Sequence, residues 1–130
     1  MSNRILPDTC AWIDFFKARP TSLAEYLKIT LTNGTICTCG VVVYELLQGI
    51  RSQKEEGMVI NAFQAMPKLE MTAASWISAG RISANLRKNG HTIPLSDIII
   101  ATLAQENDCS VLTIDQHFDL IPNLKIIRGA

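Results

Sequence analysis

The chain contains the stretch Ser110-Val111-Leu112-Thr113-Ile114-Asp115, in which a short apolar run ends at a carboxylate. The start of the chain repeats this design, because the largely apolar residues 4–7 end at Asp8. Short apolar runs that are bounded by polar residues are typical of buried strands. Helix-like segments surround both runs, so the pattern indicates strands that alternate with helices.

The remaining segments continue this alternation. We predict strands at residues 4–7, 35–39, 110–114 and 124–127, with a short extended piece at 69–71. We predict helices after Asp8-Thr9, from Pro20 to the Asn33-Gly34 turn, at 42–50, 53–66 and 73–88, from residue 95 or 96 onward, and at 117–120. Strands joined through helices form a parallel sheet that is covered on both faces. The sequence therefore predicts one domain over residues 1–130, a three-layer α/β/α fold with a central parallel sheet.

Charge and hydropathy limit the classes of partner. Lys plus Arg and Asp plus Glu each number 12 in a chain of 130 residues that is 48% hydrophobic. This balance lacks the basic field of many nucleic-acid binders, so any polyanion must be held locally. No run approaches the ~20 apolar residues of a membrane-spanning helix, and the N-terminus has no basic segment before a long apolar stretch. We therefore expect a soluble, cytoplasmic protein.

The cysteines and histidines do not form a metal-binding motif by themselves. The four cysteines lack C-x-x-C spacing and lie in apolar stretches: Cys10, Cys37, Cys39 and Cys109. We interpret them as reduced packing residues, although two alternate residues on one strand face also permit a redox role. His91 and His117 are too isolated to bind a metal alone.

Four carboxylates lie at edges between strand-like and helix-like runs: Asp8, Glu45, Asp97 and Asp115. Parallel strands end on one side of a sheet, so acids from distant segments can meet there. Taken singly, each acid also suits an exposed helix position or a first helical turn. Four such placements together favour one acidic pocket. Packed carboxylates repel one another and need a cation, and hard divalent cations take oxygen ligands.

Three neighbours of these acids have weaker assignments. Thr9 and Thr113 each lie beside an acid, where a hydroxyl either orients a carboxylate or serves only as a cap or strand-end residue. Asp14 lies six residues beyond Asp8 on the first predicted helix. We expect Asp14 to be structural or solvent-facing rather than a ligand.

Four segments carry a family resemblance, in this order along the chain: DTCAWIDFF at residues 8–16, YELLQG at 44–49, PLSDIIIA at 94–101 and LTIDQHF at 112–118. They resemble the motifs of the PIN-domain ribonucleases, specifically the VapC toxins of bacterial and archaeal toxin–antitoxin pairs. Each motif is weak alone, but the set spans nearly the whole chain.

The resemblance implies an endoribonuclease whose Asp8, Glu45, Asp97 and Asp115 bind Mg²⁺ or Mn²⁺. It implies tRNA or ribosomal RNA as substrate. It also implies a homodimer and a cognate VapB antitoxin, whose C-terminal segment covers the active site, often with an arginine among the acids.

The chemistry is consistent with the residues, because a divalent cation can activate water and offset charge at the cleaved phosphodiester. We expect in-line attack at phosphorus, leaving a 5′-phosphate and a 3′-hydroxyl. Asp8 and Asp97 are the expected direct ligands, and Glu45 and Asp115 complete the shell or act through water. Family members often carry an acid where His117 stands. We interpret His117 as a half-exposed residue at a helix start, with phosphate contact as the alternative. The next acid, Asp119, lies two residues beyond the family position, which weakens the case for a second metal ion.

Other functions have less support. A phosphoacceptor receiver domain or a haloacid-dehalogenase-type phosphatase would need a further acid just after Asp8, where Thr9 and Cys10 stand. A housekeeping PIN nuclease in RNA processing and a catalytically inactive PIN-like binding module remain as alternatives.

Surface residues give two further expectations. Six basic residues are candidates for phosphate contacts at the rim of the pocket: Lys17, Arg19, Arg51, Arg81, Arg87 and Lys88. The exposed apolar part of residues 46–66 is the expected dimer or antitoxin surface. In the helix at 73–88, the expected apolar stripe is Trp76, Ile77, Ile82 and Leu86, and we expect Trp76 to contact the core or a dimer partner.

Overall fold

The computed structural model describes residues 3–129, so residues 1–2 and 130, at the ends of the expected domain, lie outside the described residues. Strands and helices alternate along most of the chain. In order, the elements are β1 (Ile5–Pro7), α1 (Thr9–Phe16), α2 (Ser22–Leu31), β2 (Thr38–Cys39), α3 (Gly40–Gln48), α4 (Gln53–Ala65), β3 (Lys68–Leu69), α5 (Ala73–Lys88), α6 (Leu95–Glu106), β4 (Ser110–Leu112), the 3₁₀ helix η1 (Gln116–Leu120) and β5 (Ile126–Ile127).

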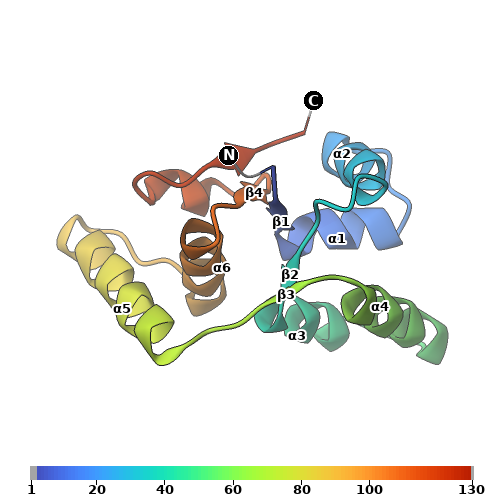
Figure 1. Cartoon of the computed structure of the whole chain (residues 1–130), viewed down its shortest axis with the longest axis horizontal. Helices are drawn as coiled ribbons and strands as arrows, with labels where there is room; N and C mark the ends of the chain where they lie inside the picture. Colours follow the sequence, from blue (N-terminus) through green and yellow to red (C-terminus); the bar gives the residue numbers. More distant parts are fainter. Residues whose placement is uncertain (1–2, 130) are drawn as a thin grey trace.

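All strand pairs are parallel. β4 lies between β1 and β5, while β2 pairs with β3, and a parallel bridge from Ile5 to Ile36 joins the two sets. The resulting order is β3-β2-β1-β4-β5. Figure 1 shows α5 and α6 on one side of β1 and β4, with α1 and α2 on the other. The predicted α/β fold with a helix-covered parallel sheet is confirmed.

The core explains why these elements pack in this way. Leu6, Val111 and Leu112 are fully buried in the sheet. Every residue from 97 to 104 in α6 is buried, so this helix is enclosed on all sides rather than along one stripe. Since α6 is enclosed, an acid near its start is held by the packing of the whole domain.

Several element ends differ from the predicted ones. The helix predicted to reach Met66 ends at Ala65, and Met66 is extended with φ −106° and ψ 153°. Pro67 explains this, because a proline disfavours the helical conformation in the residue before it. The second helix begins after Pro20, where the Thr21 hydroxyl caps it by accepting a hydrogen bond from Ala24 N. The strands are also shorter than predicted: β2 and β5 have two residues each, and β4 has three.

The predicted stripe of the long helix α5 is partly wrong. Trp76 and Ile77 are 50% and 58% exposed, so they do not belong to the core. Ser75 and Ala79 are buried instead, on the helix that packs against α6. The Ser75 hydroxyl donates to Glu106 Oε1 at 2.6 Å, at the end of α6. This bond and the small side chains select the face of α5 that approaches α6.

The cysteines match their predicted packing role. All four are free thiols, and Cys37, Cys39 and Cys109 are buried. The Sγ atoms of Cys37 and Cys109 are 3.6 Å apart. Within residues 3–129, no helix combines the length and apolar character that crossing a membrane would require.

Candidate metal-binding active site

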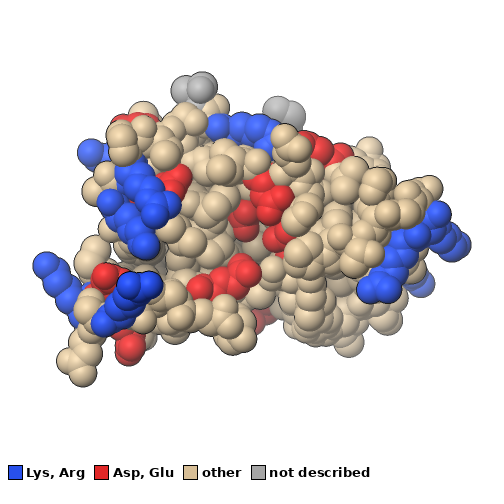
Figure 2. All heavy atoms as spheres, turned by 180° about the vertical axis from the view of Figure 1, so that it is seen from behind, with Lys and Arg blue, Asp and Glu red and all other residues tan. Residues whose placement is uncertain are grey.

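The carboxyl ends of the strands bring distant acids to one face. Asp8 directly follows β1, and Asp115 lies just beyond β4, which is the parallel neighbour of β1. Asp97 stands in the first turn of α6. Figure 2 shows acidic side chains gathered near the centre of one face. Parallel topology therefore brings these acids to one face, and we call the region between Asp8, Asp97 and Asp115 the crevice.

Asp8 is held by local and distant hydrogen bonds. It caps α1, and its Oδ1 accepts a hydrogen bond from Thr9 N at 2.8 Å. Its Oδ2 accepts bonds from Thr113 Oγ1 at 2.9 Å and from Cys10 Sγ at 3.4 Å. Burial raises the pKa of Asp8 above its ordinary value, and these hydrogen bonds partly oppose the rise. The carboxylate is therefore fixed in position before any ligand binds.

Asp97 is buried beside other negative charges. The residue is 7% exposed. Burial raises its pKa to about 6, and the charges of Asp8 and Asp115 contribute to the rise, while a hydrogen bond with His117 opposes it. A carboxylate this costly to ionise is a candidate for a site that binds a cation.

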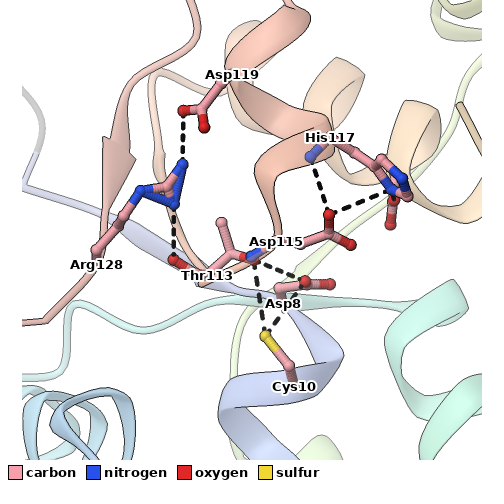
Figure 3. Close-up of polar contacts among 8 residues, drawn as sticks. Asp8, Cys10, Thr113, Asp115, His117, Asp119 and Arg128 are labelled. Carbon is pink, nitrogen blue, oxygen red and sulfur yellow. Dashed lines mark hydrogen bonds and ion pairs between the residues drawn. The ribbon is translucent and has the colours of Figure 1, made fainter.

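Asp115 joins the crevice to the short helix η1. It caps η1, with its Oδ1 accepting from His117 N at 2.9 Å. Its own backbone N–H donates to Thr113 Oγ1 at 2.9 Å, and the same hydroxyl donates to Asp8. Figure 3 shows Thr113 between Asp8 and Asp115. Thr113 therefore couples the ends of β1 and β4.

Glu45 approaches the crevice from α3. Its Oε1 accepts a hydrogen bond from Thr9 Oγ1 at 2.6 Å. Thr9 follows Asp8 and also donates its backbone N–H to that acid. The two threonines that the sequence singled out thus each contact carboxylates of the predicted set.

His117 has contacts that its position in the sequence did not suggest. Its side chain is 47% exposed, as expected, but its Nδ1 lies 2.9 Å from Asp97 Oδ2 and 3.2 Å from Asp115 Oδ1. The hydrogen bond with Asp97 raises the pKa of His117. The contact with Asp97 was not predicted from the sequence, because it is the turn after β4 that brings His117 close to α6. The sequence signal that could have indicated this contact was Asp115, an acid just beyond a strand and two residues before His117.

One group in the described part of the chain can surround a metal ion. Ligand atoms of Asp97, Asp115 and His117 all lie within 4.8 Å of one another, and among residues 3–129 this is the one such group of three or more His, Cys, Asp or Glu. Two carboxylates and an imidazole suit a divalent cation. Asp8 and Glu45 adjoin this group through threonines, rather than forming one even cluster of four acids.

Two nearby acids have other partners. Asp14 Oδ1 pairs with Arg19 Nη1 at 3.1 Å, and Asp14 Oδ2 accepts from Thr21 Oγ1 at 2.9 Å. This confirms the structural role predicted for Asp14. Asp119 forms an ion pair with Arg128, which also donates to Thr113 O (Figure 3). Neither acid belongs to the metal-sized group.

The basic residues named from the sequence are surface side chains, whereas Arg128, which was not named, lies beside Thr113 and Asp119 (Figure 3). The six candidates named from the sequence are all exposed, with Arg81, Arg87 and Lys88 on α5. Figure 2 shows basic residues toward both ends of the long axis, with the central acids between them. The arrangement leaves positive charge on either side of a negative centre.

An apolar groove leads away from Glu45. It encloses about 430 Å³ between α1, α3 and α4. Its lining is mostly apolar and includes Phe16, Leu46 and Met58, together with the charged side chains of Lys17, Glu45 and Glu55. The groove therefore connects an acid of the crevice with an apolar surface on the predicted segment 46–66.

Comparisons with known proteins agree with this architecture. A family model described as PIN domain matches residues 5–124. Ribonuclease VapC11 of Mycobacterium tuberculosis is 25% identical over 130 residues, with 97% of each chain covered. The fold is similar to that of VapBC2 from Rickettsia felis bound to a DNA fragment from their promoter, with a TM-score of 0.80, 21% identity and coverage of 97% of this chain and 98% of that chain. DNA-bound VapBC from Salmonella typhimurium gives a TM-score of 0.80, 22% identity and coverage of 96% and 97%.

Proposed function

This chain belongs to the PIN-domain family, and from that premise we propose that it is a divalent-metal-dependent endoribonuclease, the toxin of a type II toxin–antitoxin pair. The observation that carries the proposal is the group of Asp97, Asp115 and His117 beside the buried Asp8. Similarity to a relative named as a VapC ribonuclease supports RNA as the substrate. We propose tRNA or ribosomal RNA as the substrate class.

The proposed cofactor is Mg²⁺ or Mn²⁺. Because Asp115 rather than Asp8 belongs to the metal-sized group with Asp97, we place Asp97 and Asp115 as the direct ligands, instead of the pair Asp8 and Asp97 expected from the sequence. Asp8 and Glu45 would complete the surroundings of the ion. When bound, such an ion supplies Lewis acidity and activates water for attack at phosphorus. Burial is the main cause of the raised pKa of Asp97, and a bound ion would relieve the smaller contribution from the charges of Asp8 and Asp115.

The protein's own groups would orient the reaction. Thr113 holds Asp8 relative to Asp115, and Thr9 holds Glu45, so the acids keep their relative positions when RNA arrives. Hydroxyls that orient ligating carboxylates commonly affect metal sites strongly. No side chain needs to form a covalent intermediate, and hydrolysis would leave a 5′-phosphate and a 3′-hydroxyl.

The basic periphery would hold the RNA backbone. Acids alone repel a polyanion, whereas exposed Arg81, Arg87 and Lys88 lie on the helix at one end of the molecule. Lys17, Arg19 and Arg51 are exposed on segments near α1 and α3. RNA that crosses between these ends would pass over the acidic crevice.

A VapB-type antitoxin is the proposed inhibitor. The groove of about 430 Å³ has Glu45 in its lining and would take an apolar C-terminal segment of such a partner. An arginine from that segment would complement the acids. Replacing the exposed groove residue Met58 with Lys should weaken inhibition by a cognate VapB-type antitoxin while leaving cleavage intact; unchanged inhibition would contradict this placement.

A homodimer is the proposed assembly, on a different surface from the groove. Trp76, Ile77 and Leu95 are 50%, 58% and 65% exposed where α5 adjoins the start of α6. Trp76 and Leu95 also line a hollow of about 310 Å³. An exposed apolar surface of this kind marks an interface in many soluble proteins.

The dimer surface has its own test. Trp76→Glu should give a monomer in analytical ultracentrifugation, whereas Met58→Glu should leave the dimer intact. A dimeric Trp76→Glu protein and a monomeric Met58→Glu protein would instead place the dimer interface on residues 46–66. Phe63 is a poor site for such a test, because it is partly buried beside Trp12 and Phe16.

A cleavage assay tests the proposed activity. The purified chain should cut total RNA at discrete positions with Mg²⁺ or Mn²⁺, and both EDTA and Asp8→Asn should abolish this cleavage. Intact RNA with folded wild-type protein would instead favour an inactive binding module. Cleavage that survives both EDTA and Asp8→Asn would mean that the activity lies elsewhere.

A further inference from the structure

His117 presents one ring nitrogen to two carboxylates from different elements. The Nδ1 atom lies 2.9 Å from Asp97 Oδ2 and 3.2 Å from Asp115 Oδ1. Neighbouring ligands of an octahedral ion, each about 2.1 Å from it, lie about 3.0 Å apart. Both distances from Nδ1 therefore match the spacing of neighbouring ligands around one ion, as well as that of hydrogen bonds, and ligand atoms of all three residues lie within 4.8 Å of one another.

The backbone holds the imidazole in this position. His117 N donates to Asp115 Oδ1 at 2.9 Å, in the turn that opens η1. The next residue, Phe118, is fully buried and anchors the helix to the core. Figure 3 shows Asp115 accepting from the backbone of His117 and facing its ring. The ring position is thus built by the turn and does not depend on a long flexible side chain.

Asp119, the acid in the same short helix, has a partner on another side of the helix. Asp119 pairs with Arg128 Nη2, whose neighbouring Nη1 donates to Thr113 O. Arg128 therefore ties Asp119 to the far side of the β4 end (Figure 3). Of the two, His117 is the side chain of η1 that faces Asp97 and Asp115.

Resting on the metal-dependent function proposed above, we propose that His117 is a metal ligand through Nδ1. With Asp97 and Asp115 it forms a mixed oxygen and nitrogen site that selects a first-row transition ion such as Mn²⁺ over Mg²⁺. Mg²⁺ favours oxygen ligands and water, whereas imidazole favours transition metals. A ring that served only as a hydrogen-bond donor would leave the ion to oxygen ligands and give no such preference.

Pulsed electron paramagnetic resonance on Mn²⁺-loaded protein tests the ligand directly. The chain contains only two histidines, His91 and His117, and His91 is exposed outside the crevice. An imidazole ¹⁴N coupling should be present in the wild type and in His91→Ala, and absent from His117→Ala. Labelling histidine with ¹⁵N should change the coupling accordingly.

Competition calorimetry with Mn²⁺ and Mg²⁺ tests the selectivity. His117→Asp replaces nitrogen with oxygen, so it should lower the ratio of Mn²⁺ to Mg²⁺ affinity by about tenfold or more. An unchanged ratio would overturn the selectivity. Circular dichroism of each variant verifies that the fold is retained, which we expect because the His117 side chain is 47% exposed.

The outcomes separate this inference from the proposed function. If Mn²⁺ binds to the wild type and is lost in Asp97→Asn, but shows no nitrogen coupling, the metal site stands and His117 is not a ligand. If the wild type binds neither Mn²⁺ nor Mg²⁺, the metal-dependent function fails as well.

Discussion

Asp97 and Asp14 both stand on helices and both have largely buried side chains, yet they have opposite surroundings. Asp14 pairs with Arg19 and accepts a hydrogen bond from Thr21, both a few residues along the chain. Asp97 faces His117 and the charges of Asp8 and Asp115, which come from separate segments. Burial alone does not distinguish the two acids; the origin and charge of their partners does.

The same contrast extends over the molecule. Asp14, Asp108 and Asp119, outside the crevice, have Arg or Lys partners. Asp8 is held by threonine, cysteine and backbone donors. Neutral donors position a carboxylate without neutralising it, so its charge stays available for a cation. Acids outside the crevice stabilise the fold, whereas those inside it are arranged at a cost in stability.

Replacing one acid inside the crevice and one acid outside it with asparagine should give the largest difference in RNA cleavage. Asp97→Asn should lower metal-dependent RNA cleavage by more than about 100-fold, because even outer partners of metal ligands cost 10–100-fold. Asp14→Asn should change it within about twofold. Initial rates on one RNA under identical Mn²⁺ concentrations measure both. Equal losses would show that the comparison does not separate function from fold.

Removing the link between the ends of β1 and β4 should have a smaller effect. Thr113→Val deletes the hydroxyl that bonds Asp8 and the Asp115 backbone, so cleavage should fall by about 10–100-fold. Thr102→Val is the matched control, since its buried hydroxyl bonds only within α6, to Ile98 O at 2.7 Å. Metal affinity and cleavage should both be unchanged in the control. If the Thr113→Val protein cleaved RNA at the wild-type rate, Thr113 would not contribute to the site.

Stability without metal should depend on pH because of the crevice acids. The pKa of Asp97 rises from 3.8 to about 6 on folding, so folded protein binds the proton more tightly. Its contribution is therefore most favourable at low pH and is lost as pH rises through about 6. Asp8 acts in the same direction.

Asparagine substitutions measure this cost. In EDTA at pH 8, Asp97→Asn should raise the free energy of unfolding by about 1–3 kcal/mol, because a two-unit pKa shift corresponds to nearly 3 kcal/mol. Asp14→Asn should lower it by about 1 kcal/mol. Urea unfolding from pH 4 to pH 8 checks both signs, and the Asp97 variant should show a flatter dependence. A destabilised Asp97→Asn protein at pH 8 would contradict the strained-acid interpretation.

The outer ion pairs should have the smallest effect. Lys125→Gln removes the partner of an exposed acid, Asp108, and should cost less than about 1 kcal/mol. Added salt should reduce the difference further. Thermal unfolding at low and high ionic strength measures it, with cleavage rates expected to be unchanged. A larger loss of stability would show that this ion pair contributes to the stability of the fold near β4.

The sequence by itself was enough for the features that depend on neighbouring residues. The apolar run that ends at Asp8 predicted the end of β1, whereas β4 ends at Leu112, before the apolar run reaches Asp115. Turn residues such as Gly34 and Gly90, which adopt positive φ of 67° and 84°, marked helix ends. A cap or a turn is formed within a few residues, so its signal is local. The acids at the strand ends could therefore be assigned to one face before their distances were known.

Only the tertiary structure decided how those residues meet. His117 reaches Asp97 across 20 positions of sequence, and Thr113 reaches Asp8 across 105. The exposure of Trp76 likewise follows from the way Ser75 contacts α6. Residue order specifies which side chains stand at the end of each element, but the rotation and approach of packed elements set the ångström distances on which coordination and burial depend.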